Sequence, residues 1–208
     1  MNTVFRIKNS ALLPVYGTLI FIALYITATL LYPGGSQSDK EAQGFSWLNN
    51  YWCNLLNEKA INGNINPARP VALAGMLVLC STLSLFWFNF PRFAQIKNPA
   101  KIIYQLSGLL SMISAMMIFT QYHDIATNLA GAFGVIALIG TFAGLRKFQW
   151  NRLFAWGIFN LLLILLNNYL YYHSDLIYLL PVVQKISFAS FLCWICCISV
   201  MIKQTNGG

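Results

Sequence analysis

The side chains best suited to acid–base or metal chemistry are five carboxylates and two histidines, which occupy alternate gaps between long apolar segments. They are Asp39, Glu41, Glu58, His123, Asp124, His173 and Asp175. If the apolar segments cross a membrane, all seven side chains lie on one of its faces. Imidazole nitrogens and carboxylate oxygens bind divalent metals, and a metal there would activate water at a hydrophobic boundary. The first chemistry to consider is therefore hydrolysis of an amide or ester bond in a lipid.

The spacing of these residues limits such a metal site. His123 and Asp124 are adjacent, and adjacent helical side chains diverge by about 100°, so both reach one ion only if the backbone is irregular. The chain contains two histidines and has no His-x-x-x-His motif. Ordinary histidines at the membrane interface are the competing interpretation, and we assign no metal ligand.

Lys185 is the charged residue that helix packing does not explain. If its apolar segment begins near Leu179, the ammonium enters about 9 Å below the start of the helix. A bare cation there costs a few kcal/mol, so Lys185 either reaches outward to lipid phosphate or meets a carboxylate. We predict Asp124 as its partner, with Glu58 and Asp175 as alternatives. Proton exchange between Lys185 and Asp124 would suit a proton-coupled carrier.

The composition shows what kind of protein positions these residues. Hydrophobic residues make up 58% of the 208 residues and charged residues only 9%, and the mean hydropathy is +0.61. A soluble domain carries about 25% charged residues, so this chain is an integral membrane protein. Its formal charge of +8 comes largely from short loops beside apolar segments, where cations set orientation and contact anionic head groups. We expect membrane lipids as partners and no nucleic acid.

The apolar segments predict an all-α fold, a bundle of six transmembrane helices in a single domain over residues 1–208. Each is close to the roughly 20 residues that cross a hydrocarbon core of about 30 Å. The expected spans are residues 11–32, 70–90, 102–120, 128–145, 153–172 and 179–202.

The distribution of Lys and Arg predicts the orientation of the bundle. Nine lie at the N-terminus, in loops 91–101 and 146–152, and at Lys203, against three in the alternate gaps. Because cytoplasmic loops carry the excess of cations, both termini are expected in the cytoplasm. The expected location is the bacterial cytoplasmic (inner) membrane.

The long connection between the first two spans contains a helical pattern over residues 45–58. Leu48, Trp52 and Leu55 form one stripe, whereas Asn50, Asn54, Asn57 and Glu58 form another. This pattern, rich in Trp and Tyr, predicts an amphipathic helix in the outer interface. It is either a simple anchor or a lid whose Asn54 and Glu58 face a polar cavity.

Small and polar residues recur within the spans. Ser107, Ser111 and Ser114 have helical spacing, as do Asn160 and Asn167. Such residues let helices approach closely and hydrogen-bond across their interface, so we interpret them mainly as packing residues. Asn167 lies close enough to His173 in sequence to be a candidate for the polar site as well.

Several short segments resemble a known group of membrane proteins. They are residues 51–56 (YWCNLL), 66–70 (NPARP), 123–124 (HD) and 180–185 (LPVVQK). With six spans, the chain resembles uncharacterised bacterial six-span families that are remotely similar to the Frag1/DRAM group. The resemblance implies a six-helix bundle and supplies no catalytic residue. Eukaryotic members are linked to lipid remodelling, which favours a lipid ligand.

Together these observations predict an outward-facing polar pocket, roofed by the helix over residues 45–58, that binds a lipid head group or a small polar ligand. The predicted lining residues are Asn54, Glu58, His123, Asp124, Asn167, His173, Asp175 and Lys185. A metal-dependent intramembrane lipid hydrolase and a proton-coupled carrier are the alternatives. The sequence identifies no catalytic residue and no cofactor.

Overall fold

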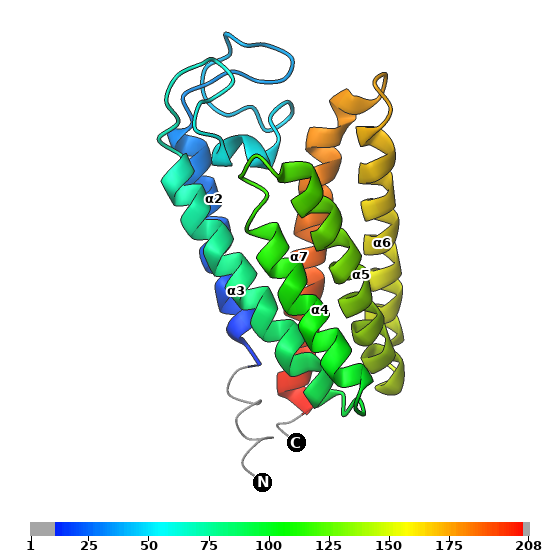
Figure 1. Cartoon of the computed structure of the whole chain (residues 1–208). Coiled ribbons are helices and arrows are strands. Elements are labelled where there is room, and N and C mark those ends of the chain that lie inside the picture. Colours follow the sequence, from blue (N-terminus) through cyan, green and yellow to red (C-terminus); the bar gives the residue numbers. More distant parts are fainter. Residues whose placement is uncertain (1–10, 206–208) are drawn as a thin grey trace. The chain divides into compact units, whose positions relative to one another are not determined.

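A computed structural model describes residues 11–205, which are predominantly helical (Figure 1). The α-helices are α2 (Leu13–Leu31), α3 (Arg69–Phe93), α4 (Ala100–Ala115), α5 (His123–Lys147), α6 (Asn151–Tyr171) and α7 (Leu180–Thr205). Two short 3₁₀ helices are η1 (Trp52–Leu56) and η2 (Ile177–Leu179). Extended pairing in the described part is limited to two isolated bridges, Gly34 with Gln43 and Lys59 with Ile65. The basic residues Arg6 and Lys8 lie outside the described residues.

Five helical segments are long and apolar enough to cross a membrane: Leu13–Leu31, Arg69–Phe93, His123–Lys147, Asn151–Tyr171 and Ile177–Thr205. They coincide with five of the six predicted spans. The span expected over 102–120 is shorter, because α4 ends at Ala115 after 16 residues and turns follow. Sixteen residues extend about 24 Å, less than a core of about 30 Å. The structure therefore shows a multi-pass helical membrane protein with five evident spans.

The chain divides into two compact units. Unit 1 comprises Met1–Leu19, Leu77–Gly157 and Cys193–Gly208, and unit 2 comprises Ile20–Met76 and Ile158–Leu192. The boundaries fall inside helices, and α4 and α5 belong wholly to unit 1.

Small residues allow close packing between helices in unit 1, as expected from their spacing. Ser107, Ser111 and Ser114 are all buried on α4. Ser111 Oγ donates a hydrogen bond of 2.8 Å to the carbonyl oxygen of Ala130 on α5. Gly140 of α5 lies against the Tyr104 side chain of α4, so closely that a Cβ at this glycine would be 2.9 Å from Tyr104 Cβ. These contacts confirm the packing role of the small residues.

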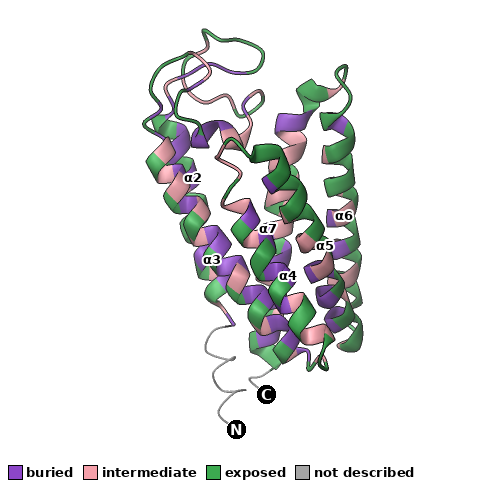
Figure 2. Cartoon of the chain, viewed as in Figure 1, coloured by how far each residue is buried: buried purple, intermediate pink, exposed green. Residues whose placement is uncertain are grey.

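Burial alternates around the helices (Figure 2). In unit 2, α6 exposes apolar side chains such as Leu162 (58%) and Leu165 (64%). Apolar exposure on a candidate span is what contact with lipid requires, because hydrocarbon solvates these side chains.

The connection between α2 and α3, residues 32–68, is here called the cap segment. The single amphipathic helix predicted over residues 45–58 was wrong: the structure has a turn at 47–49 and then the 3₁₀ helix η1. Polar side chains form hydrogen bonds with backbone groups that would pair with each other in an α-helix. Asn50 Oδ1 accepts from the Ser46 N–H at 2.8 Å, and Asn54 Oδ1 accepts from the Tyr51 N–H at 2.7 Å. Such local side-chain bonds compete with helix formation.

Candidate functional site

The eight predicted ligand-binding residues are divided between the units. His123 and Asp124 begin α5 in unit 1. The other six, Asn54, Glu58, Asn167, His173, Asp175 and Lys185, belong to unit 2.

Lys185 forms the junction between the cap segment and α7 within unit 2. Its ammonium donates to the carbonyl oxygens of Asn50 (2.5 Å) and Pro181 (2.9 Å). The face of the Phe45 ring lies 5.7 Å from Lys185 Nζ. No carboxylate among the described residues of unit 2 lies within salt-bridge distance of it. Two neutral carbonyls therefore hold the cation, and one of its three N–H donors has no acceptor in this unit.

The side chains of Asn50 and Asn54 hold the backbone of the cap segment in place at this junction. Asn50 is fully buried, and its Nδ2 donates to the Gly35 carbonyl at 2.9 Å. The predicted stripes of an amphipathic helix do not describe this segment, because Asn50 of the polar stripe is buried and Leu48 of the apolar stripe is 67% exposed. The chain needs Asn50 inside because its side chain satisfies backbone groups that the irregular loop leaves unpaired. Asn54, predicted to bind a ligand, is occupied by backbone contacts in the same way.

Trp52 anchors the junction through aromatic contacts. Its ring centroid lies 5.0 Å from that of Tyr25 on α2 and 5.5 Å from that of Phe188 on α7. The Trp52 backbone N–H donates to Gln184 Oε1 at 3.3 Å. The Trp52 indole Nε1–H is buried without a hydrogen-bond partner among the described residues. A second donor at the junction thus remains unused.

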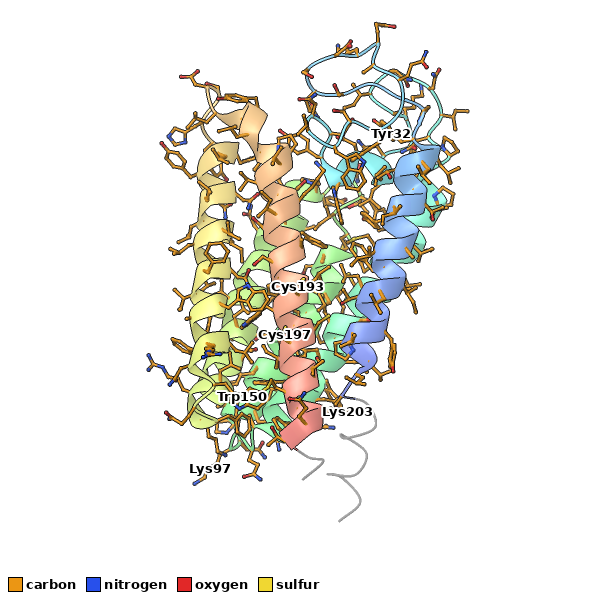
Figure 3. The ribbon with its side chains drawn as sticks, turned by 180° about the vertical axis from the view of Figure 1, so that it is seen from behind. Tyr32, Lys97, Trp150, Cys193, Cys197 and Lys203 are labelled. Carbon is orange, nitrogen blue, oxygen red and sulfur yellow. The ribbon has the colours of Figure 1, made fainter. Side chains whose placement is uncertain are left out.

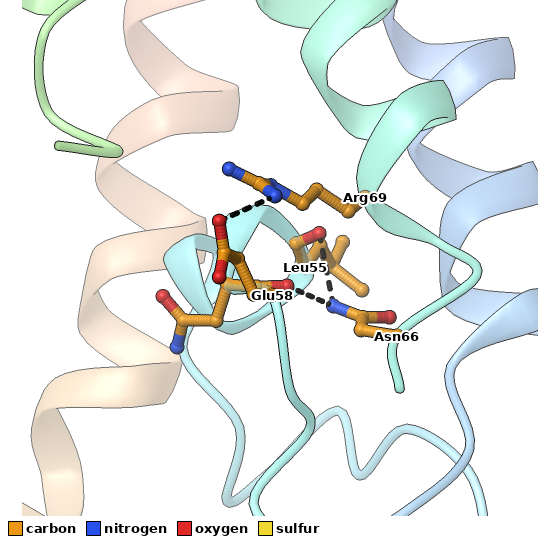
Figure 4. A network of polar contacts seen from close by, with 5 residues as sticks. Leu55, Glu58, Asn66 and Arg69 are labelled. Carbon is orange, nitrogen blue, oxygen red and sulfur yellow. Dashed lines mark hydrogen bonds and ion pairs between the residues drawn. The ribbon is translucent and has the colours of Figure 1, made fainter. Parts of the chain in front are cut away.

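Glu58 does not face a cavity, contrary to the lid prediction. Its side chain is 78% exposed, and its carboxylate forms an ion pair with Arg69, 2.9 Å from Oε1 to Nη1 (Figure 4). Nearby, the Asn66 amide donates to the carbonyls of Leu55 (3.2 Å) and Asn57 (2.9 Å). These contacts fix the end of η1 and its connection to α3.

The remaining predicted site residues have local partners. Asn167 Nδ2 donates to Ser187 Oγ of α7 at 2.6 Å, a bond between helices of unit 2. The His173 ring lies tilted against the Tyr169 ring, with centroids 3.9 Å apart. His173 is exposed, as is Asp175. In unit 1, His123 Nδ1 lies 3.0 Å from Asp124 Oδ1. Asp124 also lies in the first turn of α5, where a helix favours negative charge.

The described residues contain no group of three or more His, Cys, Asp or Glu side chains able to hold a metal ion. Burial raises the pKa of the Cys53 thiol in the cap segment, an effect that exceeds the lowering by the nearby Lys185 ammonium. Cys53 is therefore a neutral thiol near pH 7, in a form that is a poor nucleophile.

A feature that the sequence did not predict is a cavity of about 900 Å³ in unit 1. It lies between residues 149–156 and the last turns of α7, and Figure 3 labels Trp150 and Cys197 of its lining. None of the eight predicted ligand-binding residues lines it. In the sequence, the nearby Trp150 and Trp156 were the feature that could have indicated this cavity.

No protein-family model, curated protein or solved structure matches this chain. The resemblance to the Frag1/DRAM group accordingly remains a prediction.

Proposed function

We propose that this chain is a six-span protein of the bacterial cytoplasmic membrane, with both termini inside, that binds an anionic group at Lys185. The group is the head group of a membrane lipid or a small anionic ligand, and α4 supplies the sixth span. The observation that carries the proposal is the Lys185 ammonium, half-buried and held by neutral carbonyls of Asn50 and Pro181.

The argument rests on the cost of an uncompensated charge. A cation removed from water needs a counter-charge or strong acceptors, and two carbonyl oxygens leave its net charge in place. A phosphate or carboxylate oxygen would accept the remaining N–H of Lys185 in a charge-assisted bond. The Trp52 indole N–H of the cap segment is a further donor that is buried without a partner among the described residues.

Thermal unfolding in detergent tests the proposal, with dihexanoyl phosphatidylglycerol and glycerol 3-phosphate as probes. Binding to the folded state adds RT ln(1 + [L]/Kd), about 2.7 kcal/mol at 100 times Kd. We expect a probe to raise the Tm of the wild type and of Lys59→Met, which removes an exposed cation of unit 2. We expect little increase for Lys185→Met.

The pair of probes distinguishes the two sources of the anion. A response to both indicates recognition of the phosphate group, whereas a response to the lipid alone indicates that the glyceride part contributes. Equal responses from Lys185→Met and the wild type would refute the site. If Lys185→Met does not fold, Lys185→Gln keeps a hydrogen-bond donor without the charge and serves instead.

A further inference from the structure

The cavity of unit 1 has polar lining residues gathered at one end and a lining that is otherwise mainly apolar. The polar side chains come from the connection before α6, the start of α6 and the last turn of α7, and they are Gln149, Asn151, Arg152 and Gln204. Apart from Trp150 and Leu153, the apolar side chains come from later in α6 and from earlier in α7, and include Trp156, Val200 and Met201. A volume of about 900 Å³ lies in the range of ligand sites, about 300–1,000 Å³. The cavity therefore suits a molecule with one polar and one apolar end.

The polar end carries an uncompensated positive charge. Arg152 is exposed, and no hydrogen bond or ion pair of its guanidinium occurs among residues 11–205. The described part of unit 1 has one carboxylate, Asp124, in the first turn of α5, whereas Arg146 and Lys147 lie in its last turn. Twenty-five residues extend about 37 Å, so Asp124 does not neutralise this end.

The apolar end is open to lipid rather than to water, because both α6 and α7 are candidate spans. Trp150 lies at the polar end of the lining, the depth at which Trp is enriched in membrane proteins. We propose that this cavity binds one anionic phospholipid of the surrounding bilayer. Its phosphate lies on Arg152 and the neighbouring amides, and an acyl chain lies against Trp156 and Val200. This site is separate from Lys185, in the other unit.

Photocrosslinking tests the proposal on the full chain in phosphatidylcholine vesicles. The probes are phosphatidylglycerol and phosphatidylcholine, each with a diazirine on the same acyl chain, and labelled peptides are identified by mass spectrometry. We expect label in residues 149–156 and 196–204. Because one basic residue contributes roughly 1 kcal/mol to binding of an anionic lipid, the phosphatidylglycerol signal there should exceed the phosphatidylcholine signal about fivefold.

Matched variants distinguish binding at this site from attraction of the lipid by general surface charge. Arg152→Gln should bring the ratio of the two signals close to one. Lys97→Gln, which removes an exposed cation of unit 1 outside the cavity lining, should leave it unchanged. Val200→Trp should fill the cavity and reduce labelling by both lipids. Lys185→Met should leave these peptides labelled as in the wild type, whatever the outcome at the Lys185 site.

The proposal is overturned if Arg152→Gln and Lys97→Gln lower the ratio equally, or if neither peptide is enriched. The proposal is also overturned if the Val200→Trp variant is labelled as strongly as the wild type. It is overturned as well if Val200→Trp converts a dimer to a monomer in detergent, since a second copy of the chain would then occupy the cavity.

Discussion

Asn50 forms hydrogen bonds with three separate parts of unit 2, at Gly35, Ser46 and Lys185. Its side chain bonds the Ser46 N–H and the Gly35 carbonyl, and its own carbonyl accepts from Lys185. Removing the amide leaves buried backbone groups without partners, which costs about 1–3 kcal/mol for each group.

We therefore predict that Asn50→Ala lowers the free energy of unfolding by at least about 2 kcal/mol, measured by thermal unfolding in detergent. Asn57→Ala is the matched control, because the Asn57 side chain is exposed and has no hydrogen bond within the described residues. Similar losses in both variants would show that the burial of Asn50 is not important for stability.

Lys185 gives a second prediction, because the partners of its ammonium within unit 2 are the backbone carbonyls of Asn50 and Pro181 and not a carboxylate. The double change Asp124→Asn with Lys185→Met should cost the sum of the two single changes, within about 0.5 kcal/mol. The four unfolding free energies form a double-mutant cycle. A coupling well above 1 kcal/mol would restore Asp124 as the partner and remove the basis for anion binding.

Among the elements, α4 and α5 pack closely at Gly140, where a side chain would meet Tyr104. We predict that Gly140→Ala lowers stability in detergent by about 1–3 kcal/mol, the usual cost of overpacking. Gly131→Ala on the same helix should leave stability unchanged or slightly higher, because the added methyl group meets no atom within 4 Å apart from the local backbone of its own helix. If both variants unfold at the wild-type temperature, α4 and α5 separate easily at this point.

For the chain as a whole, the opposite charges of alternate gaps predict which loops face the cytoplasm. Single cysteines at positions 40 and 175 should react with a membrane-impermeant maleimide added to intact cells. Cysteines at positions 97 and 147 should react only after the cells are opened, because loops rich in Lys and Arg remain inside. Labelling of position 97 in intact cells would invert the topology and move Lys185 to the cytoplasmic side.

Local chemistry made the five evident spans predictable. A run of about 20 apolar residues crosses a membrane whatever its neighbours are, so α2, α3, α5, α6 and α7 followed from composition and length. The burial of Ser107, Ser111 and Ser114 also followed, because small polar residues at helical spacing fit a helix interface.

Contacts between segments that are distant in sequence determine the burial of Asn50, the partners of Lys185 and the cavity beside Arg152, and residue spacing did not predict these features. The cap segment has a helical pattern, yet Asn50 lies inside because Gly35, 15 residues earlier, needs its amide. Lys185 meets the carbonyl of Asn50, 135 residues away, which no local rule identifies. The cavity beside Arg152 likewise forms only where the start of α6 lies against the end of α7. Apolar periodicity specifies which segments become helices, but the partners of a buried polar group depend on which segments fold against each other.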